Sequence, residues 1–249
     1  MTTHPDRVGT SQRVLDVWRA ELAPVAGPWS LLLSTPELEL SHGDVRPCEG
    51  AGAAAPLLVA QAADLRAAAR GTDEPHLTTV LDAAARAARP TSGTSGEAMA
   101  ELVSLLGGAD AVNDRLRRGG HQTRFAHDGS SMLVPGEHAE TMAALTGNPA
   151  YEAVLPAFLA DAPFGLAAYL VADAVLWHTQ GWSVAARQDG GVLALPDGGD
   201  LTVHVRAVVA DPHRSGDRPL LDDPVYAAFG RALGRTLALL GHGALRIPT

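Results

Sequence analysis

The sequence contains no lysine, and all 19 of its basic side chains are arginines. A mechanism that needs a lysine base or a lysine Schiff base is therefore excluded. The single cysteine, Cys48, cannot form an internal disulfide, which agrees with a reducing compartment. Aromatic residues make up only 4% of the chain and hydrophobic residues 46%, so the core must be built mostly from Ala, Leu and Val. Alanine-rich and arginine-rich segments of this kind favour helices.

Long apolar runs are also missing. Residues 1–18 lack the apolar core of a secretory signal, and no run is long enough to cross a membrane. With the lone cysteine, this predicts a cytoplasmic protein that has no membrane partner. The net charge of -9 and the absence of basic runs argue against a nucleic-acid partner. Arg115, Arg117 and Arg118 cluster on a predicted helix, where we expect a solvated face.

Metal-ligand spacing is absent as well. The ten histidines show no His-x-x-x-His or His-x-His pattern, and no cysteine pair accompanies them. We therefore expect no metal site, and no motif indicates a cofactor.

The apolar periodicity predicts a chain of helices interrupted by short strands. With 249 residues, the chain is long enough for one large or two small domains. A hairpin is expected around Thr35-Pro36, and residues 121–135 are interpreted as a loop because they lack periodicity. The predicted helices are 11–22, 53–69, 77–89, 97–106, 109–118, 136–145 and 225–240, and the later strands are 182–187, 191–195 and 201–210.

The stretch from Trp177 to Val192 has the most informative pattern. An apolar approach, a break at Gly181 and an apolar restart predict two adjacent antiparallel strands. The first contains His178-Thr179-Gln180-Gly181, and Ala186-Arg187-Gln188-Asp189 leads into the second. This pattern resembles the third conserved box of the class A serine β-lactamases and penicillin-binding proteins, where a strand with His-Lys-Thr-Gly or Lys-Ser-Gly lines the active site.

The resemblance covers nearly the whole chain, because the predicted order of elements is also that of the β-lactamase and DD-peptidase fold. It implies an α/β (α+β) architecture: a five-stranded antiparallel sheet flanked by the N- and C-terminal helices, plus an all-helical subdomain. The sheet part would comprise residues 1–52 and 173–249, and the helical part residues 53–172.

The catalytic residues of the family are missing at each matching position. Its Ser-x-x-Lys box falls on Ala53 and Pro56 or, in a second register, on Ala55 and Leu58. Counting back from Gly107-Gly108 places Thr94-Ser95-Gly96 at the Ser-Asp-Asn box. In the third box, Thr179 stands where the lysine would be.

The hydrolytic glutamate of the family follows a Thr-Arg pair, and it has no counterpart here. Thr123-Arg124 is present, but the loop 125–133 that follows has no glutamate. It offers His127, Asp128, Ser130 and Ser131 instead. The resemblance therefore predicts the fold without the serine acyl-enzyme.

The remaining polar residues define the candidate site. For catalysis we single out His178, Thr179, Gln180, Thr94 and Ser95, with the His178 imidazole as general acid or base. For substrate binding we single out Gly181, Trp182, Arg187, His127 and Asp128.

Several of these residues, and the neighbouring Trp177, have a purely structural alternative. His178 could cap a strand end, and His127 and Asp128 could form a solvated loop. Arg187 could clamp a ligand carboxylate or form a surface ion pair with Asp189. Trp177 and Trp182 could wall a ligand pocket or pack on the terminal helix.

Three functions remain open from the sequence. The first is non-covalent acid-base chemistry on a small molecule by a tailoring enzyme of specialised metabolism, such as a cyclase, isomerase or hydrolase. The second is a binding protein that sequesters a ligand without turnover. The third is a hydrolase whose nucleophile has moved to Thr94, Ser95 or Ser92. The resemblance is a weak warrant for any particular reaction.

Overall fold

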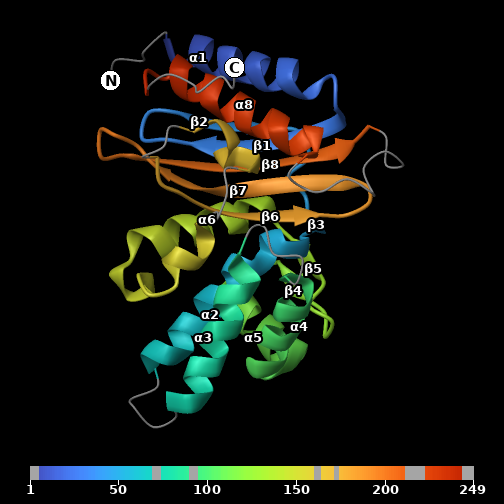
Figure 1. Cartoon of the computed structure of the whole chain (residues 1–249), viewed down its shortest axis with the longest axis vertical. Coiled ribbons are helices and arrows are strands. Elements are labelled where there is room, and N and C mark those ends of the chain that lie inside the picture. Colours follow the sequence, from blue (N-terminus) through green and yellow to red (C-terminus); the bar gives the residue numbers. More distant parts are fainter. Residues whose placement is uncertain are drawn as a thin grey trace.

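A five-stranded antiparallel sheet forms the centre of the computed structural model, which describes residues 6–68, 74–89, 95–159, 164–170, 174–210 and 222–242 (Figure 1). The strand order is β2-β1-β8-β7-β6, so β2 and β6 are the edge strands. The strands are β1 (Ala26–Ser34), β2 (Glu39–His42), β6 (Leu176–Trp182), β7 (Ala186–Ala194) and β8 (Asp200–Val209).

Helices from the two ends of the described chain cover one face of this sheet. They are α1 (Asp6–Leu22) and α8 (Pro224–Leu239). The short 3-10 helix η4 (Gly165–Tyr169) packs against α8 on the same face. Val203, Val205 and the large side chains of Trp18 and Phe229 are fully buried in this core. Trp18 also donates its indole N–H to Thr236 at 3.1 Å, which ties α1 to α8.

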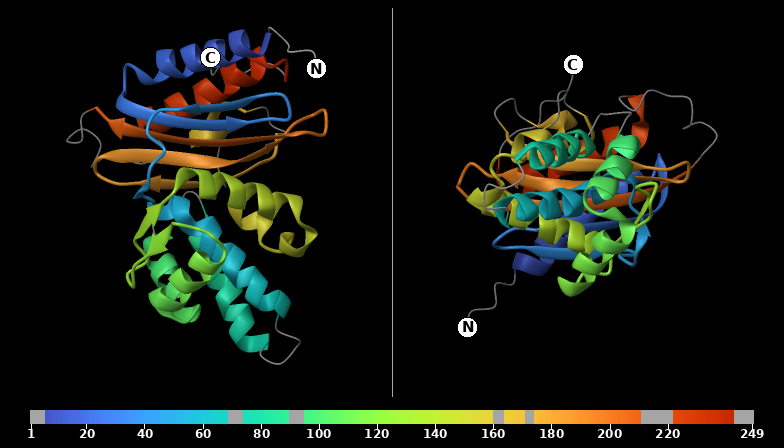
Figure 2. Two further views of the ribbon diagram at one scale, coloured as in Figure 1. Left: turned by 180° about the vertical axis from the view of Figure 1, so that it is seen from behind. Right: turned by 90° about the horizontal axis from the view of Figure 1, so that it is seen from below.

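A second, alanine-rich core lies on the other side of the sheet (Figure 1). Small side chains such as Ala84 and Ala87 let these helices approach closely, and α6 packs against β7 and β8 (Figure 2). The elements are η1 (Ala51–Ala54), α2 (Ala55–Ala68), α3 (Glu74–Ala88), α4 (Ser95–Leu105), α5 (Gly108–Arg118), α6 (Pro135–Gly147), η2 (Pro149–Tyr151) and η3 (Leu155–Phe158).

Residues of the two cores cross the expected boundaries in both directions, since Val192 belongs to the alanine-rich core. Phe164 and Leu166 precede residue 173, yet they belong to the core beneath α8. The division into residues 1–52 with 173–249 and residues 53–172 stays a prediction.

The predicted α/β (α+β) architecture and the positions of its helices are confirmed, with boundaries that shift by a few residues. The strand predicted at 182–187 is wrong, because residues 183–185 form the turn between β6 and β7. That turn contains Val184 and Ala185, whose apolar character imitates a strand. None of the helices in the described ranges is long and apolar enough to span a membrane.

The interpretation of residues 121–135 as a plain loop is also wrong. This segment contains β4 (Arg124–Phe125) and β5 (Ser131–Leu133), which form a small sheet with β3 (Cys48–Glu49) in the order β3-β5-β4. Strands of two and three residues are too short to show an alternating pattern. The pairing of β5 with β3 also joins distant parts of the chain, which local sequence does not reveal.

A buried ion pair attaches α8 to the end of β7. Arg187 and Asp223 are both 4% exposed at their side chains, and Arg187 Nε donates to Asp223 Oδ2 at 2.7 Å. The other oxygen of Asp223 accepts the backbone N–H of Val225 at 2.9 Å and thereby caps α8. One carboxylate thus serves both the ion pair and the helix terminus.

We predict that Asp223→Ala lowers the free energy of unfolding by about 3–5 kcal/mol, because it leaves a buried guanidinium without its carboxylate. Urea denaturation followed by circular dichroism measures the loss. The neighbouring Asp222 is exposed, so Asp222→Ala should change stability by less than about 0.5 kcal/mol. Equal losses in the two variants would contradict a structural role for the ion pair.

Candidate functional site

The two parts of the fold meet where η1 packs against the edge strand β6. A Cβ atom at Gly181 would overlap the carbonyl oxygen of Gly50, so glycine is needed for this close approach. Gln188 reinforces the contact, because its Nε2 donates to the carbonyl oxygens of Glu49 at 2.7 Å and Gly50 at 2.6 Å. The junction is thus closed by backbone and amide contacts.

The start of α2 offers no nucleophile at this junction. Ala53, Pro56, Ala55 and Leu58 are all buried, whichever register is taken for the missing Ser-x-x-Lys box. None of them has a group that could attack a carbonyl or accept a proton. The lack of a nucleophile and base at this box, inferred from the sequence, therefore also holds in the folded protein.

The second box is described only in part. Thr94 lies outside the described residues, as does Ser92. Ser95 is the first residue of α4, and its side chain lies outside the described part. The roles proposed for Thr94 and Ser95 stay predictions.

The three polar residues of β6 do not share one site. Side chains of neighbouring residues in a strand point to opposite faces. Thr179 faces the junction, where its Oγ1 lies 3.5 Å from the carbonyl oxygen of Ala53. His178 and Gln180 face the opposite side, towards η4, and are 0% and 2% exposed. The expectation of a joint His178, Thr179 and Gln180 site is corrected for this reason.

On the η4 side, His178 and Gln180 both bind the buried carboxylate of Asp189. Its Oδ1 accepts from His178 Nδ1 at 2.8 Å, and its Oδ2 accepts from Gln180 Nε2 at 3.0 Å. The backbone N–H of Leu166 also donates to Oδ2 at 2.9 Å. Three donors therefore satisfy the carboxylate, and the network attaches η4 to the sheet.

On the junction side, Thr179 is the first member of a chain of buried polar groups. His138 on α6 places its Nε2 3.0 Å from Thr179 Oγ1, and its Nδ1 lies 3.1 Å from Nδ1 of His204 on β8. The exposed fractions of Thr179, His138 and His204 are 1%, 0% and 1%. A Cβ atom at Gly190 would lie 2.7 Å from His138 and 2.9 Å from His204, so this glycine makes room for both rings.

Both imidazoles are held neutral. Burial, followed by the charge of Arg206, lowers the pKa of His204 from 6.5 to about 4. Burial and the neighbouring His204 and His178 hold the pKa of His138 well below its usual range. Desolvation dominates because the charged form loses its hydration and gains no anionic partner.

One tautomer arrangement satisfies most of the chain. If His204 donates from Nδ1 to His138 Nδ1, then His138 Nε2 carries a proton for Thr179, whose hydroxyl can donate towards Ala53. Nε2 of His204 is then a buried acceptor, and it has no hydrogen-bond partner in the described structure. In the opposite arrangement His138 donates to His204 and Thr179 donates to His138, so the carbonyl oxygen of Ala53 loses its donor. Both arrangements keep the rings neutral, and conversion of the first into the second takes up a proton at His204 Nε2 and releases one at Thr179.

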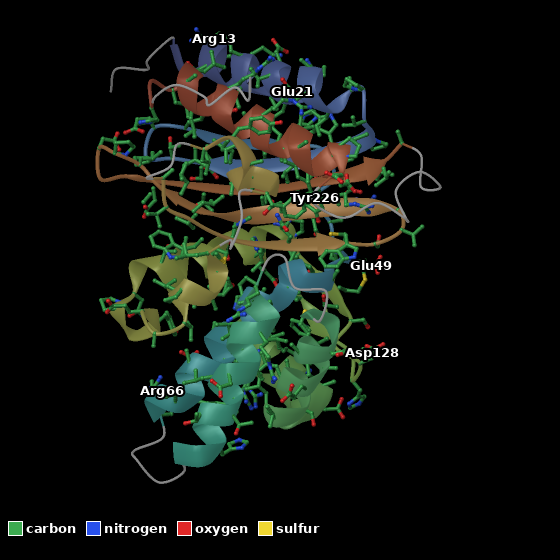
Figure 3. The ribbon with its side chains drawn as sticks, in the orientation of Figure 1. Arg13, Glu21, Glu49, Arg66, Asp128 and Tyr226 are labelled. Atoms are coloured by element: carbon green, nitrogen blue, oxygen red, sulfur yellow. The ribbon has the colours of Figure 1, made fainter. Side chains whose placement is uncertain are left out.

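The predicted substrate-binding residues are dispersed. Gly181 and Trp182 lie at the end of β6, where Gly181 is buried in the η1 contact and Trp182 is half-buried. Tyr226 of α8 reaches this strand end, and its hydroxyl donates to the carbonyl oxygen of Gly181 at 2.9 Å (Figure 3). Trp177 packs on the helical core, whereas we expected the terminal helix.

Arg187, His127 and Asp128 do not converge on the junction. Arg187 is committed to Asp223 in the core, so the expected clamp and the surface ion pair with Asp189 are both corrected. His127 and Asp128 are exposed in the turn between β4 and β5, and Asp128 projects outward (Figure 3). Asp128 accepts from the backbone and hydroxyl of Ser130, and these bonds lower its pKa. The solvated-loop alternative describes this pair.

Sequence reasoning missed His138 and His204. His204 occupies the polar face of an alternating strand, and Gly190 lies opposite it in β7, which together could have indicated a buried group. His138 gave no local signal, because α6 reaches the sheet only through the tertiary fold. No group of three or more His, Cys, Asp or Glu suited to a metal ion occurs within the described ranges.

Solved structures identify the fold. The class A β-lactamase from Bacteroides cellulosilyticus DSM 14838 matches with a TM-score of 0.68 and 14% identity, over 92% of this chain and 98% of that one. That from Mycobacterium abscessus gives 0.68 and 12%, over 92% and 99%. A variant of the class A enzyme of the last common ancestor of Gram-negative bacteria gives 0.67 and 16%, over 94% and 99%.

This chain therefore has the class A β-lactamase fold, and the low identities show the fold alone. No protein-family model matches the sequence. The comparison with curated proteins also finds no match.

We predict that acid destabilises the protein through His204. A histidine with a lowered folded-state pKa contributes stability above its unfolded pKa, near 6.5, and loses it as the pH falls towards about 4. Between these values His204→Asn should reduce the slope of unfolding free energy against pH by about 1.4 kcal/mol per pH unit. Urea titrations at several pH values measure the slope.

The exposed His127 supplies the control, since His127→Asn should leave the slope unchanged. If His204→Asn and the parent protein had the same slope, the buried neutral imidazole would be disproved.

Proposed function

We propose that this protein uses the class A β-lactamase fold for non-covalent acid-base chemistry on a small molecule. In this proposal it is a cytoplasmic tailoring enzyme of specialised metabolism, such as a cyclase, isomerase or hydrolase. The observation that carries the proposal is the hydrogen-bonded chain of Thr179, His138 and His204, which ends beside Ala53 at the junction of the two cores.

Thr179 is the group that would exchange a proton with the ligand. Its contact with the carbonyl oxygen of Ala53 is 3.5 Å long, so that oxygen holds the hydroxyl hydrogen only weakly. Thr179 is 1% exposed, so a ligand oxygen or nitrogen would replace this partner when η1 moves away from β6. The step balances when the hydroxyl gives its proton to one ligand atom and accepts a proton from another, so that Thr179 ends as it began. His138 would hold the hydroxyl in place through its hydrogen bond, and both rings would stay neutral, as the low pKa of His204 requires.

Covalent catalysis is disfavoured by the residues that the chain lacks. Neither register of the nucleophile box supplies a hydroxyl, and the chain contains no lysine to activate one. Cys48 is the only thiol, and burial raises its pKa, which suppresses the reactive thiolate. We therefore expect chemistry without a covalent intermediate.

A second candidate function is ligand sequestration without turnover. It is favoured by the burial of the proton chain, because Thr179, His138 and His204 are at most 1% exposed. Under this alternative the chain is an internal polar contact that joins α6 to the sheet.

We predict that intact-protein mass spectrometry detects no adduct after incubation with a penicillin, a cephalosporin or a fluorophosphonate. A class A β-lactamase with its serine in place serves as the positive control under the same conditions. An adduct mapped to Ser92, Thr94, Ser95 or Cys48 would overturn the non-covalent proposal and support a relocated nucleophile.

We also predict that Thr179→Val abolishes most turnover of any metabolite that the parent protein converts. A pool of candidate metabolites is screened by mass for conversion, and removal of a proton-transfer group should slow the reaction about 10²–10⁴-fold. The valine has the same shape, so ligand binding should persist in calorimetry. Full activity in this variant would refute the role of Thr179, and binding without conversion in the parent protein would establish sequestration.

A further inference from the structure

A pocket lies outside the junction, between α2, the end of α5 and α6, with a volume of about 370 Å³. Its floor is apolar and includes Leu57, Leu65 and Leu116. Polar side chains from all three helices also line it: Gln61 from α2, Arg115 from α5 and Thr141 from α6. The pocket therefore combines an apolar surface with a group of hydrogen-bond donors.

Gln61, which lines this pocket, has a buried side-chain donor without a partner. The side chain is 9% exposed, and its Oε1 accepts from Arg115 Nε at 2.8 Å. That bond assigns the amide orientation, because the guanidinium can only donate. Its Nε2 is consequently a buried donor with no hydrogen-bond partner. Native structures rarely leave such a group unsatisfied, since it loses its hydration without compensation.

Arg115 adds a positive charge that lacks an acidic partner among the described residues. Its Nη2 donates to the carbonyl oxygen of Leu106 at 2.6 Å, and its Nε donates to Gln61. Burial, with the charge of Arg118, lowers the pKa of Arg115, as expected for a desolvated cation without a counterion. The sequence had suggested a solvated face for this cluster, and Arg115 departs from it.

One acidic residue, Asp64, also lines the pocket. Asp64 accepts the Tyr151 hydroxyl at 2.6 Å, and this bond is the largest cause that raises the pKa of Tyr151 to about 12. Asp64 directs one of its oxygens to Tyr151, and neither Gln61 nor Arg115 has an acidic partner in the described structure.

We propose that this pocket binds a small carboxylate with an apolar body. Its carboxylate would accept from the Arg115 guanidinium and, after a small rotation of the buried amide, from Gln61 Nε2, and its body would lie against Leu57, Leu65 and Leu116. This binding site is separate from the acid-base chemistry proposed at Thr179, so either can fail without the other.

The test is isothermal titration calorimetry with hexanoate and 3-phenylpropionate, each compared with its primary amide. We expect the carboxylates to bind and the amides to bind at least about tenfold more weakly, because a neutral amide loses the charge-assisted bonds. In NMR spectra of the parent protein, we also expect the side-chain amide resonance of Gln61 to shift when either carboxylate is added. The Gln61→Met variant assigns that resonance.

Three variants locate the site. Gln61→Met and Arg115→Gln remove one donor group each, and Ala60→Phe fills the pocket while it leaves the donors in place. Each should weaken carboxylate binding by at least about tenfold, the loss typical of one strong hydrogen bond. The matched control is Arg117→Gln, since Arg117 is exposed and pairs with Asp114 outside the pocket.

Several results would overturn the proposal. They are an absence of binding by both carboxylates, equal binding of acid and amide, and unchanged binding in Ala60→Phe. Acetate or chloride binding as tightly as hexanoate would also overturn it, because the apolar body would then contribute nothing.

Discussion

The close contact between η1 and β6 is the constraint on which this structure depends. It joins the two hydrophobic cores, and it exists because Gly181 has no side chain to hold Gly50 away. Gln188 then secures both carbonyl oxygens of the Glu49-Gly50 segment. This contact, together with the packing of α6 on β7 and β8, positions the helical part against the sheet, and it places Ala53 beside Thr179.

Buried polar networks lie on both faces of strand β6. Only the network on the η4 side contains a carboxylate. On the η4 side, the carboxylate of Asp189 accepts from three donors. On the junction side, the chain from Thr179 to His204 contains no carboxylate, so its imidazoles are held neutral. The first arrangement suits a structural support, whereas the second places a hydroxyl at the junction that is held by neutral rings, with no buried charge beside it.

Much of the architecture could be predicted from local pattern. The apolar spacing of Val14, Trp18 and Leu22 indicates α1, and the alternation of Val203 and Val205 with polar neighbours indicates β8. The small sheet of β3, β4 and β5 could not be predicted, because strands of two or three residues have no readable period. The apolar turn at Val184 misled in the opposite direction, since it extended a strand pattern into a connection.

The sequence by itself determined what chemistry is unavailable. The chain contains no lysine, and the positions that match the Ser-x-x-Lys box hold Ala53 and Pro56 or Ala55 and Leu58. The family's acyl-enzyme residues are therefore missing in any fold that the chain adopts. It also indicated the class A β-lactamase fold through the order of its elements. Only the tertiary structure decided which polar groups meet. His138 and Thr179 are 41 residues apart, His138 and His204 are 66 apart, and the pleat of β6 turns His178 away from the neighbour with which it was grouped. Such meetings depend on strand register and helix docking, which no local segment contains.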